Sequence, residues 1–213
     1  MVGSRTDPRP GLQAELSIPV VYVYAPSMNP DDASLAADNV LAGRLVTEHL
    51  LDLGHRHIAH IGGDVTYAAA RDRLEGIEAR LAESGLALTG PPMEFGTWSE
   101  AWGRARMHAI LDRTPEVDAV ICASDQIARG ALDTLRERRV PVPDQVAIAS
   151  FDNWEILAAG PRPMLTSLDM NFEKMGRLAA KFLFDAIDGH PHKGLSLVPG
   201  RLVVRGSTVP GLA

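Results

Sequence analysis

Short apolar runs alternate with longer segments of helical period along almost the whole sequence, and this alternation constrains the fold most. The apolar runs "PVVYVY", "HIAHIGG", "AVICA" and "VAIASFD" are typical of buried strands. Apolar residues recur at helical spacing in segments 38–53, 69–84, 99–113, 127–138 and 172–187. Strands that alternate with helices form a mostly parallel sheet with helices on both faces, so the sequence predicts an α/β fold.

Glycines and prolines mark the limits of these segments. Gly54 and Gly85 each follow a helical segment, where a residue that accepts a left-handed conformation ends a helix well. We expect one further strand at residues 92–96. Two extended segments, 195–198 and 201–207, lie on either side of Pro199 and close the chain.

Composition excludes several classes of protein. Hydrophobic residues make up 46% and charged residues 23% of the 213 residues, as in globular rather than disordered or membrane proteins. The net charge of −6 argues against a nucleic-acid-binding surface, because phosphates need a local excess of Lys and Arg. The single cysteine, Cys122, is expected to be buried, and residues 1–16 contain no unbroken apolar segment of a secretory signal. We therefore expect a cytoplasmic protein.

Three polar residues stand where the run "AVICA" meets the next helical segment. Ser124, Asp125 and Gln126 fill this junction. One interpretation is a helix N-cap, which would account for one of the three. The other is a ligand-binding group, because open α/β sheets bind ligands at the carboxyl ends of their strands.

Five ordered motifs carry a resemblance that covers residues 18–208. They read "DNVLAGRLVTEHLLDLGHRHIAHIGG", "RDRLEGIEARLAESG", "ASDQIARGALDTLRERRVPVPDQVAIASFDN", "PMLTSLDMNFEKMGRLAAKFL" and "LVVRGST". In this order and spacing they resemble the effector-binding core of the lactose/galactose repressor family, which is similar in fold to periplasmic sugar-binding proteins.

The resemblance implies two doubly wound, parallel-sheet subdomains of the periplasmic-binding-protein-like type. Residues 38–169 with 198–209 would form the C-terminal subdomain. Residues 17–37 with 170–197 would form the remnant of an incomplete N-terminal subdomain, and residues 1–16 an irregular leader without a helix-turn-helix. The chain thus resembles an N-terminally truncated member of the family.

The family's function is the expected function of the chain. A small molecule such as a sugar, a polyol, a nucleoside or a nucleobase would bind in the cleft between the subdomains and modulate DNA binding by the full-length repressor. That repressor would be a homodimer, with a DNA-binding headpiece absent from this chain. No cofactor, metal or membrane is expected.

Seven residues fall on the family's effector-binding positions or beside them: Arg73, Trp98, Ser124, Asp125, Asp152, Tyr24 and Met170. The charged groups suit hydroxyls of a polyhydroxylated ring, and an indole suits its apolar C–H face. Asp125 is expected to act as an N-cap that shapes its turn. Tyr24 and Met170 replace more polar family residues, so they make the pocket less polar than a simple sugar site.

Each main assignment has a structural alternative that the sequence leaves open. Arg73 could form a surface ion pair, Asp152 could cap a turn, and Trp98 could belong to the core.

Other functional classes are disfavoured by the sequence. The three histidines of "HRHIAH" and Asp64 resemble a metal cluster but lack the spacing of a helical HxxxH motif or paired cysteines. The sequence contains no GxSxG motif, and "IGGDV" is too short for a phosphate-binding loop, so we expect no enzyme. A free-standing solute-binding protein is the alternative function, against which the missing export signal counts.

Overall fold

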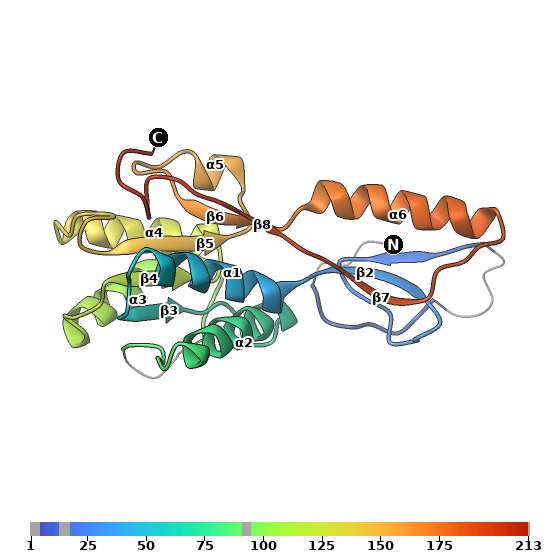
Figure 1. The fold of residues 1–213 in the computed structure, drawn as a ribbon, viewed down its shortest axis with the longest axis horizontal. Helices are drawn as coiled ribbons and strands as arrows, with labels where there is room; N and C mark the ends of the chain where they lie inside the picture. The colour runs from blue at the N-terminus through green and yellow to red at the C-terminus, as the bar shows by residue number, and fades with distance from the viewer. Residues whose placement is uncertain (1–4, 13–17, 91–94, 213) are drawn as a thin grey trace. The chain divides into compact units, whose positions relative to one another are not determined.

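The computed structural model describes residues 5–12, 18–90 and 95–212 of the chain, and these form two compact units. Unit 1 consists of the described residues of Met1–Asp38, Tyr67–Ala69 and Met170–Gly200. Unit 2 consists of those of Asn39–Thr66, Ala70–Asp169 and Arg201–Ala213. Each unit has a sheet of its own, so each is described by itself (Figure 1).

Unit 2 is built on a five-stranded sheet in the order β3-β4-β5-β6-β8. The strands are β3 (Ile58–Ile61), β4 (Ala119–Cys122), β5 (Ala147–Phe151), β6 (Thr166–Asp169) and β8 (Arg201–Val203). The first four are parallel, and β8 pairs antiparallel with β6. The carboxyl ends of β3 to β6 therefore meet at one edge of the sheet.

The helices of unit 2 are α1 (Asn39–Asp52), α2 (Ala68–Glu83), α3 (Glu100–Arg113), α4 (Asp125–Glu137) and the short α5 (Glu155–Ala158). The first two residues of α2 are grouped with unit 1. Gly54 and Gly85, which follow α1 and α2, both have positive φ angles, so they end these helices in the left-handed conformation that glycine favours.

Both faces of the unit 2 sheet are buried. On β4, Val120 and Cys122 belong to one apolar cluster with residues of α3 and α4, and neighbouring Ala119 and Ile121 are equally inaccessible. Successive side chains of a strand point to opposite faces, so burial of all four requires cover on both sides. This explains why the strand is a continuous apolar run.

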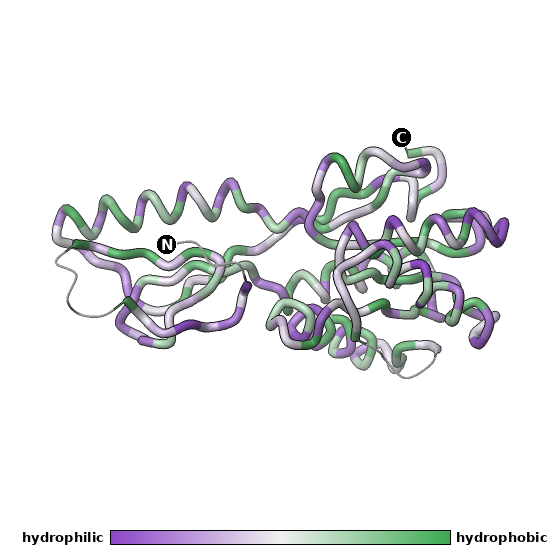
Figure 2. The backbone as a smooth tube through the Cα atoms, turned by 180° about the vertical axis from the view of Figure 1, so that it is seen from behind, coloured by the Kyte–Doolittle hydropathy of each residue, from purple (hydrophilic) through white to green (hydrophobic). Residues whose placement is uncertain are grey.

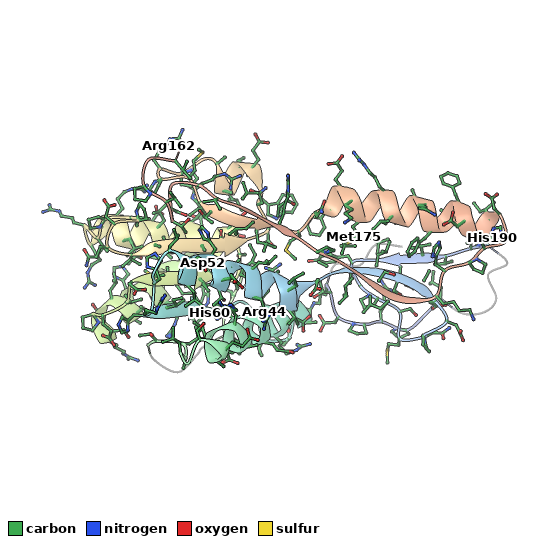
Figure 3. The ribbon with its side chains drawn as sticks, viewed as in Figure 1. Arg44, Asp52, His60, Arg162, Met175 and His190 are labelled. Carbon is green, nitrogen blue, oxygen red and sulfur yellow. The ribbon has the colours of Figure 1, made fainter. Side chains whose placement is uncertain are left out.

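Unit 1 has a smaller sheet of three parallel strands in the order β1-β2-β7. The strands are β1 (Val21–Val23), β2 (Ala33–Ala37) and β7 (Gly194–Val198), and helix α6 (Phe172–Ile187) contacts β1 and β2. Met175, labelled in Figure 3, is the buried residue of α6.

The structure confirms the predicted α/β class with mainly parallel sheets. Five of the helices begin and end within two residues of the predicted segments, and Cys122 is buried as expected. The prediction of a strand at 92–96 is wrong where it can be examined, because residues 95 and 96 are not in a strand; residues 92–94 lie outside the described residues. Strands β2 and β6 were not predicted.

None of the helices in the described part of the chain combines the length and the apolar content that spanning a bilayer requires.

Candidate functional site

The polar junction after β4 contains a serine that caps the next helix and an aspartate with a different role. Ser124 is the N-cap of α4, and its hydroxyl oxygen accepts a hydrogen bond from the backbone N–H of Ile127 at 3.3 Å. Asp125 is the first residue of α4. The expectation that Asp125 is an N-cap is therefore wrong, since Ser124 already supplies the oxygen that the free N–H groups need.

The carboxylate of Asp125 instead reaches the neighbouring strands. Its Oδ1 accepts hydrogen bonds from the hydroxyls of Ser150 on β5 and Ser167 on β6, both at 2.6 Å, and its Oδ2 accepts one from the backbone N–H of Trp154 at 2.8 Å. Burial, together with the nearby negative charge of Asp152, raises the pKa of Asp125 to about 6. The three hydrogen bonds act in the opposite direction, because they favour the charged carboxylate.

Arg73 connects three segments of unit 2 at the carboxyl ends of the strands. It lies in the second turn of α2 and is only 4% exposed. Its Nε donates to Oδ1 of Asn39 at 3.0 Å, and its terminal nitrogens donate to the carbonyl of Ala123 at 2.5 Å and to Oδ1 of Asp152 at 2.9 Å. These contacts use three of its five N–H donors, so the guanidinium is fixed in orientation.

Two further features hold Arg73 in place. Its guanidinium carbon lies 4.8 Å from the centre of the Phe151 ring, a cation–π contact. Helices α1 and α2 also approach so closely there that a Cβ at Gly43 would overlap the carbonyl oxygen of Arg73. The backbone and the head group of Arg73 are therefore both restrained.

Asp152 follows β5 in an unusual backbone conformation. Its φ angle is 97°, and that of Asn153 is 52°, both in the left-handed region that non-glycine residues rarely adopt. Its backbone N–H donates to the carbonyl of Leu168 at 2.9 Å, and its side chain is 22% exposed where it meets Arg73. Asp152 is thus an accessible carboxylate beside a buried guanidinium.

Trp98 lies beside the turn that follows β3. A Cβ at Gly63 would overlap the six-membered part of the Trp98 indole, so the ring rests directly on the glycine backbone. Trp102 lies next to it and donates from Nε1 to the carbonyl of Gly62 at 2.8 Å. Both indoles are partly buried against the apolar cluster of unit 2, so Trp98 belongs in part to the core.

His60 is a half-buried neighbour of this site on β3 (labelled in Figure 3). Burial lowers its pKa to about 4, and the positive charge of Arg73 acts in the same direction. The ring is therefore neutral at physiological pH. Within the described residues, no group of three or more His, Cys, Asp or Glu side chains could hold a metal ion.

The structure brings four of the seven predicted residues together in unit 2: Arg73, Ser124, Asp125 and Asp152. Tyr24 and Met170 lie in unit 1, where Tyr24 has a φ angle of 75° and its ring meets the edge of Phe172 at 5.8 Å between centres. Met170 is buried.

Sequence reasoning missed the partners that orient the predicted residues. Asn39 at the start of α1, Ser150 and Ser167 bind the charged groups, yet each lies at least 25 positions away in the chain from the residue it contacts. Asn39 carried the one usable signal, because it is a polar residue beside the predicted boundary between the two subdomains at residues 37 and 38.

Comparison with known proteins assigns the family. A model described as a periplasmic binding protein-like domain matches residues 47–208. The chain belongs to this family. The regulator CelR of Thermobifida fusca is 35% identical over 196 residues, which cover 91% of this chain and 57% of that protein. GalR of Escherichia coli K12 is 29% identical over 179 residues, which cover 84% and 52%.

Solved structures agree with this assignment. The Escherichia coli repressor ascG has a TM-score of 0.82 at 27% identity and is matched over 92% of this chain and 71% of its own. A complex of CelR with cellobiose has a TM-score of 0.77 at 33% identity, over 88% and 58%. The resemblance to the lactose/galactose repressor family is confirmed. These relatives are transcriptional regulators and not enzymes, and this chain spans about half the length of the curated ones.

Proposed function

We propose that the chain is the effector-sensing core of a bacterial transcriptional regulator of the repressor type. A sugar-like or nucleoside-like molecule would bind at the carboxyl ends of the unit 2 strands and modulate DNA binding by the whole protein. The ion pair of Arg73 and Asp152 is the observation that carries this proposal, because it places a fixed guanidinium and an accessible carboxylate where α/β sheets bind ligands.

The chemistry of these side chains suits a ligand with several hydroxyl groups. A guanidinium donates hydrogen bonds to hydroxyl oxygens, and a carboxylate accepts hydrogen bonds from hydroxyl groups. The pair can therefore bind neighbouring hydroxyls of one ligand. Ser124 adds a hydroxyl, and Trp98 adds an indole face for the apolar side of a ring. Tyr24 and Met170 remain proposed contacts from unit 1.

A sugar is the first effector to test, since a relative's structure is a complex of CelR with cellobiose. The relatives disfavour the alternative of a free-standing solute-binding protein, because they are transcriptional regulators. For the whole protein we propose a cytoplasmic homodimer whose DNA-binding part lies outside this chain.

The test is a thermal-shift screen of cellobiose with other sugars, polyols, nucleosides and purine bases, followed by calorimetry on any compound that stabilises the chain. Replacing Arg73 by Ala should weaken binding by about 2 to 4 kcal/mol, the cost of removing one partner of a buried charged hydrogen bond. Arg80→Ala is the matched control, because Arg80 lies on the same helix and pairs at the surface with Glu48. Equal affinities for the two variants, with both folded, would refute the assignment.

A further inference from the structure

The turn Phe151–Trp154 is strained and carries Asp152. Two consecutive non-glycine residues, Asp152 and Asn153, have positive φ angles there. Such conformations persist only where surrounding contacts determine them. The contacts that hold this turn therefore decide whether Asp152 meets Arg73.

Side chains from three other segments hold the turn. Asp125 accepts from the N–H of Trp154 at 2.8 Å, and Ser167 accepts from the N–H of Asn153 at 3.0 Å. Arg205 donates to the side-chain oxygen of Asn153 at 2.7 Å. The hydroxyl of Ser167 in turn donates to Asp125, which points its lone pairs toward Asn153. Asp125 thus fixes one turn N–H directly and orients the group that fixes another.

We propose that Asp125 is a positioning residue whose ionised carboxylate holds the Phe151–Trp154 turn, and thereby Asp152, in the conformation that meets Arg73. It acts through hydrogen bonds and does not touch the effector. The consequence for binding rests on the proposed function, whereas the control of the turn does not.

The charges around Asp125 make the turn sensitive to pH. The groups that face it are Asp152 from the turn itself and Cys122 at the end of β4, while Arg73 and Arg205 act one residue further away, through Asp152 and Asn153. Burial and Asp152 raise the pKa of Asp125 to about 6. A neutral acid accepts hydrogen bonds more weakly than a carboxylate, so the turn should loosen as the pH falls through that value.

Trp154 reports on the turn, because its backbone N–H is the group that Asp125 binds and its side chain is exposed. We would label the full chain with 5-fluorotryptophan and record fluorine NMR spectra between about pH 7.5 and 5, a range that spans the protonation of Asp125. The chain has three tryptophans, and Trp154→Phe identifies the signal. In the unmodified chain this signal should move with a midpoint near pH 6, the pKa of Asp125.

Two variants of Asp125 separate positioning from mere stability. In Asp125→Asn the amide oxygen can accept from the N–H of Trp154 while the amide NH2 donates to the serine hydroxyls, so this variant should keep a sharp Trp154 signal and lose its pH dependence. Asp125→Ala should broaden or shift the signal at every pH. Asp112→Asn is the control, because Asp112 pairs with Arg138 at the surface and should leave the titration unchanged.

The same titration in Asp125→Asn, or an unchanged Trp154 signal in Asp125→Ala, would overturn the proposal. An effector arm separates it from the proposed function. If cellobiose or another screened compound binds, Asp125→Ala should weaken binding by about 10-fold at neutral pH, by analogy with residues that orient the ligands of metal sites. If no compound binds while the Trp154 results hold, the proposed function fails and the role of Asp125 stands.

Discussion

Two titratable residues near Arg73, the half-buried His60 and the buried Asp125, change stability with pH in opposite directions. The pKa of His60 is lowered to about 4 and that of Asp125 is raised to about 6, in each case mainly by burial. Burial favours the neutral form of both groups. His60 therefore contributes stability that is present above the pKa of an unfolded histidine and lost on acidification. Asp125 contributes stability in acid that is lost as the pH rises through 6.

Replacing His60 by Gln should make the chain less sensitive to acid. Between about pH 6.5 and 4 the unfolded chain binds a proton at His60 and the folded chain does not, so folding loses up to about 3 kcal/mol. This loss disappears in His60→Gln. Urea unfolding at several pH values measures it, with His190→Gln as control because His190 is exposed (Figure 3). Equal pH slopes in the unmodified chain and His60→Gln would contradict the expectation.

At the same scale, the sequence predicts which polar residues end the strands but not how they pair. Arg73 on α2 and Asp152 after β5 were each assigned to the site through the family resemblance, and the structure shows that they form an ion pair with each other. The bonds from Ser150 and Ser167 to Asp125 depend on the order of β4, β5 and β6 in the sheet. That order is a tertiary property which no local pattern in the sequence carries.

Among the elements, helices were predicted better than strands, and the reason is physical. Helices α1 and α2 have an apolar period and a glycine after their last turn. Strand β2 has the sequence "ASLAA", whose small residues have little preference for strands, and its burial comes from the neighbours β1 and β7. Figure 2 shows how hydrophobic and hydrophilic residues alternate along α6, which was predicted to the residue.

Glycine permits the close packing of α3 against α4, which yields a prediction for these elements. A Cβ at Gly130 would overlap the carbonyl oxygen of Glu100, so Gly130→Ala must push the two helices apart. We expect a loss of about 3 kcal/mol, at the upper end of overpacking effects. Gly176→Ala on α6 meets no atom within 4 Å and should stabilise the chain by up to about 1 kcal/mol. Thermal or urea unfolding measures the change in the free energy of unfolding for each variant. Equal changes would contradict the prediction, because they would show that α3 and α4 can move apart without losing stability.

At the scale of the whole molecule, the two units differ in how well they cover their apolar residues. In unit 2 both faces of the sheet are buried. In unit 1, α6 buries Met175, whereas Phe184 and Ile187 are 64% and 60% exposed. The three short strands of this sheet bury only Met175 among the 16 residues of α6. The larger share of the apolar stabilisation therefore lies in unit 2, which also contains Arg73 and Asp152.

The chain as a whole should not bind DNA with sequence specificity, although its relatives are HTH-type regulators. Its net charge is −6, and the described residues before α1 form no helix that could enter a groove. The one basic cluster, "RERR" at 136–139, is largely neutralised, because Arg136 pairs with Asp133 and Arg138 with Asp112.

We expect only non-specific DNA binding by this chain at physiological salt, with a Kd of about 10⁻⁴ M or weaker. Fluorescence anisotropy with palindromic and scrambled duplexes of equal length, at about 50 and 200 mM salt, measures both affinity and selectivity. Tighter, salt-resistant binding of the palindrome would reveal a DNA-binding surface that neither the charge nor the described helices provide.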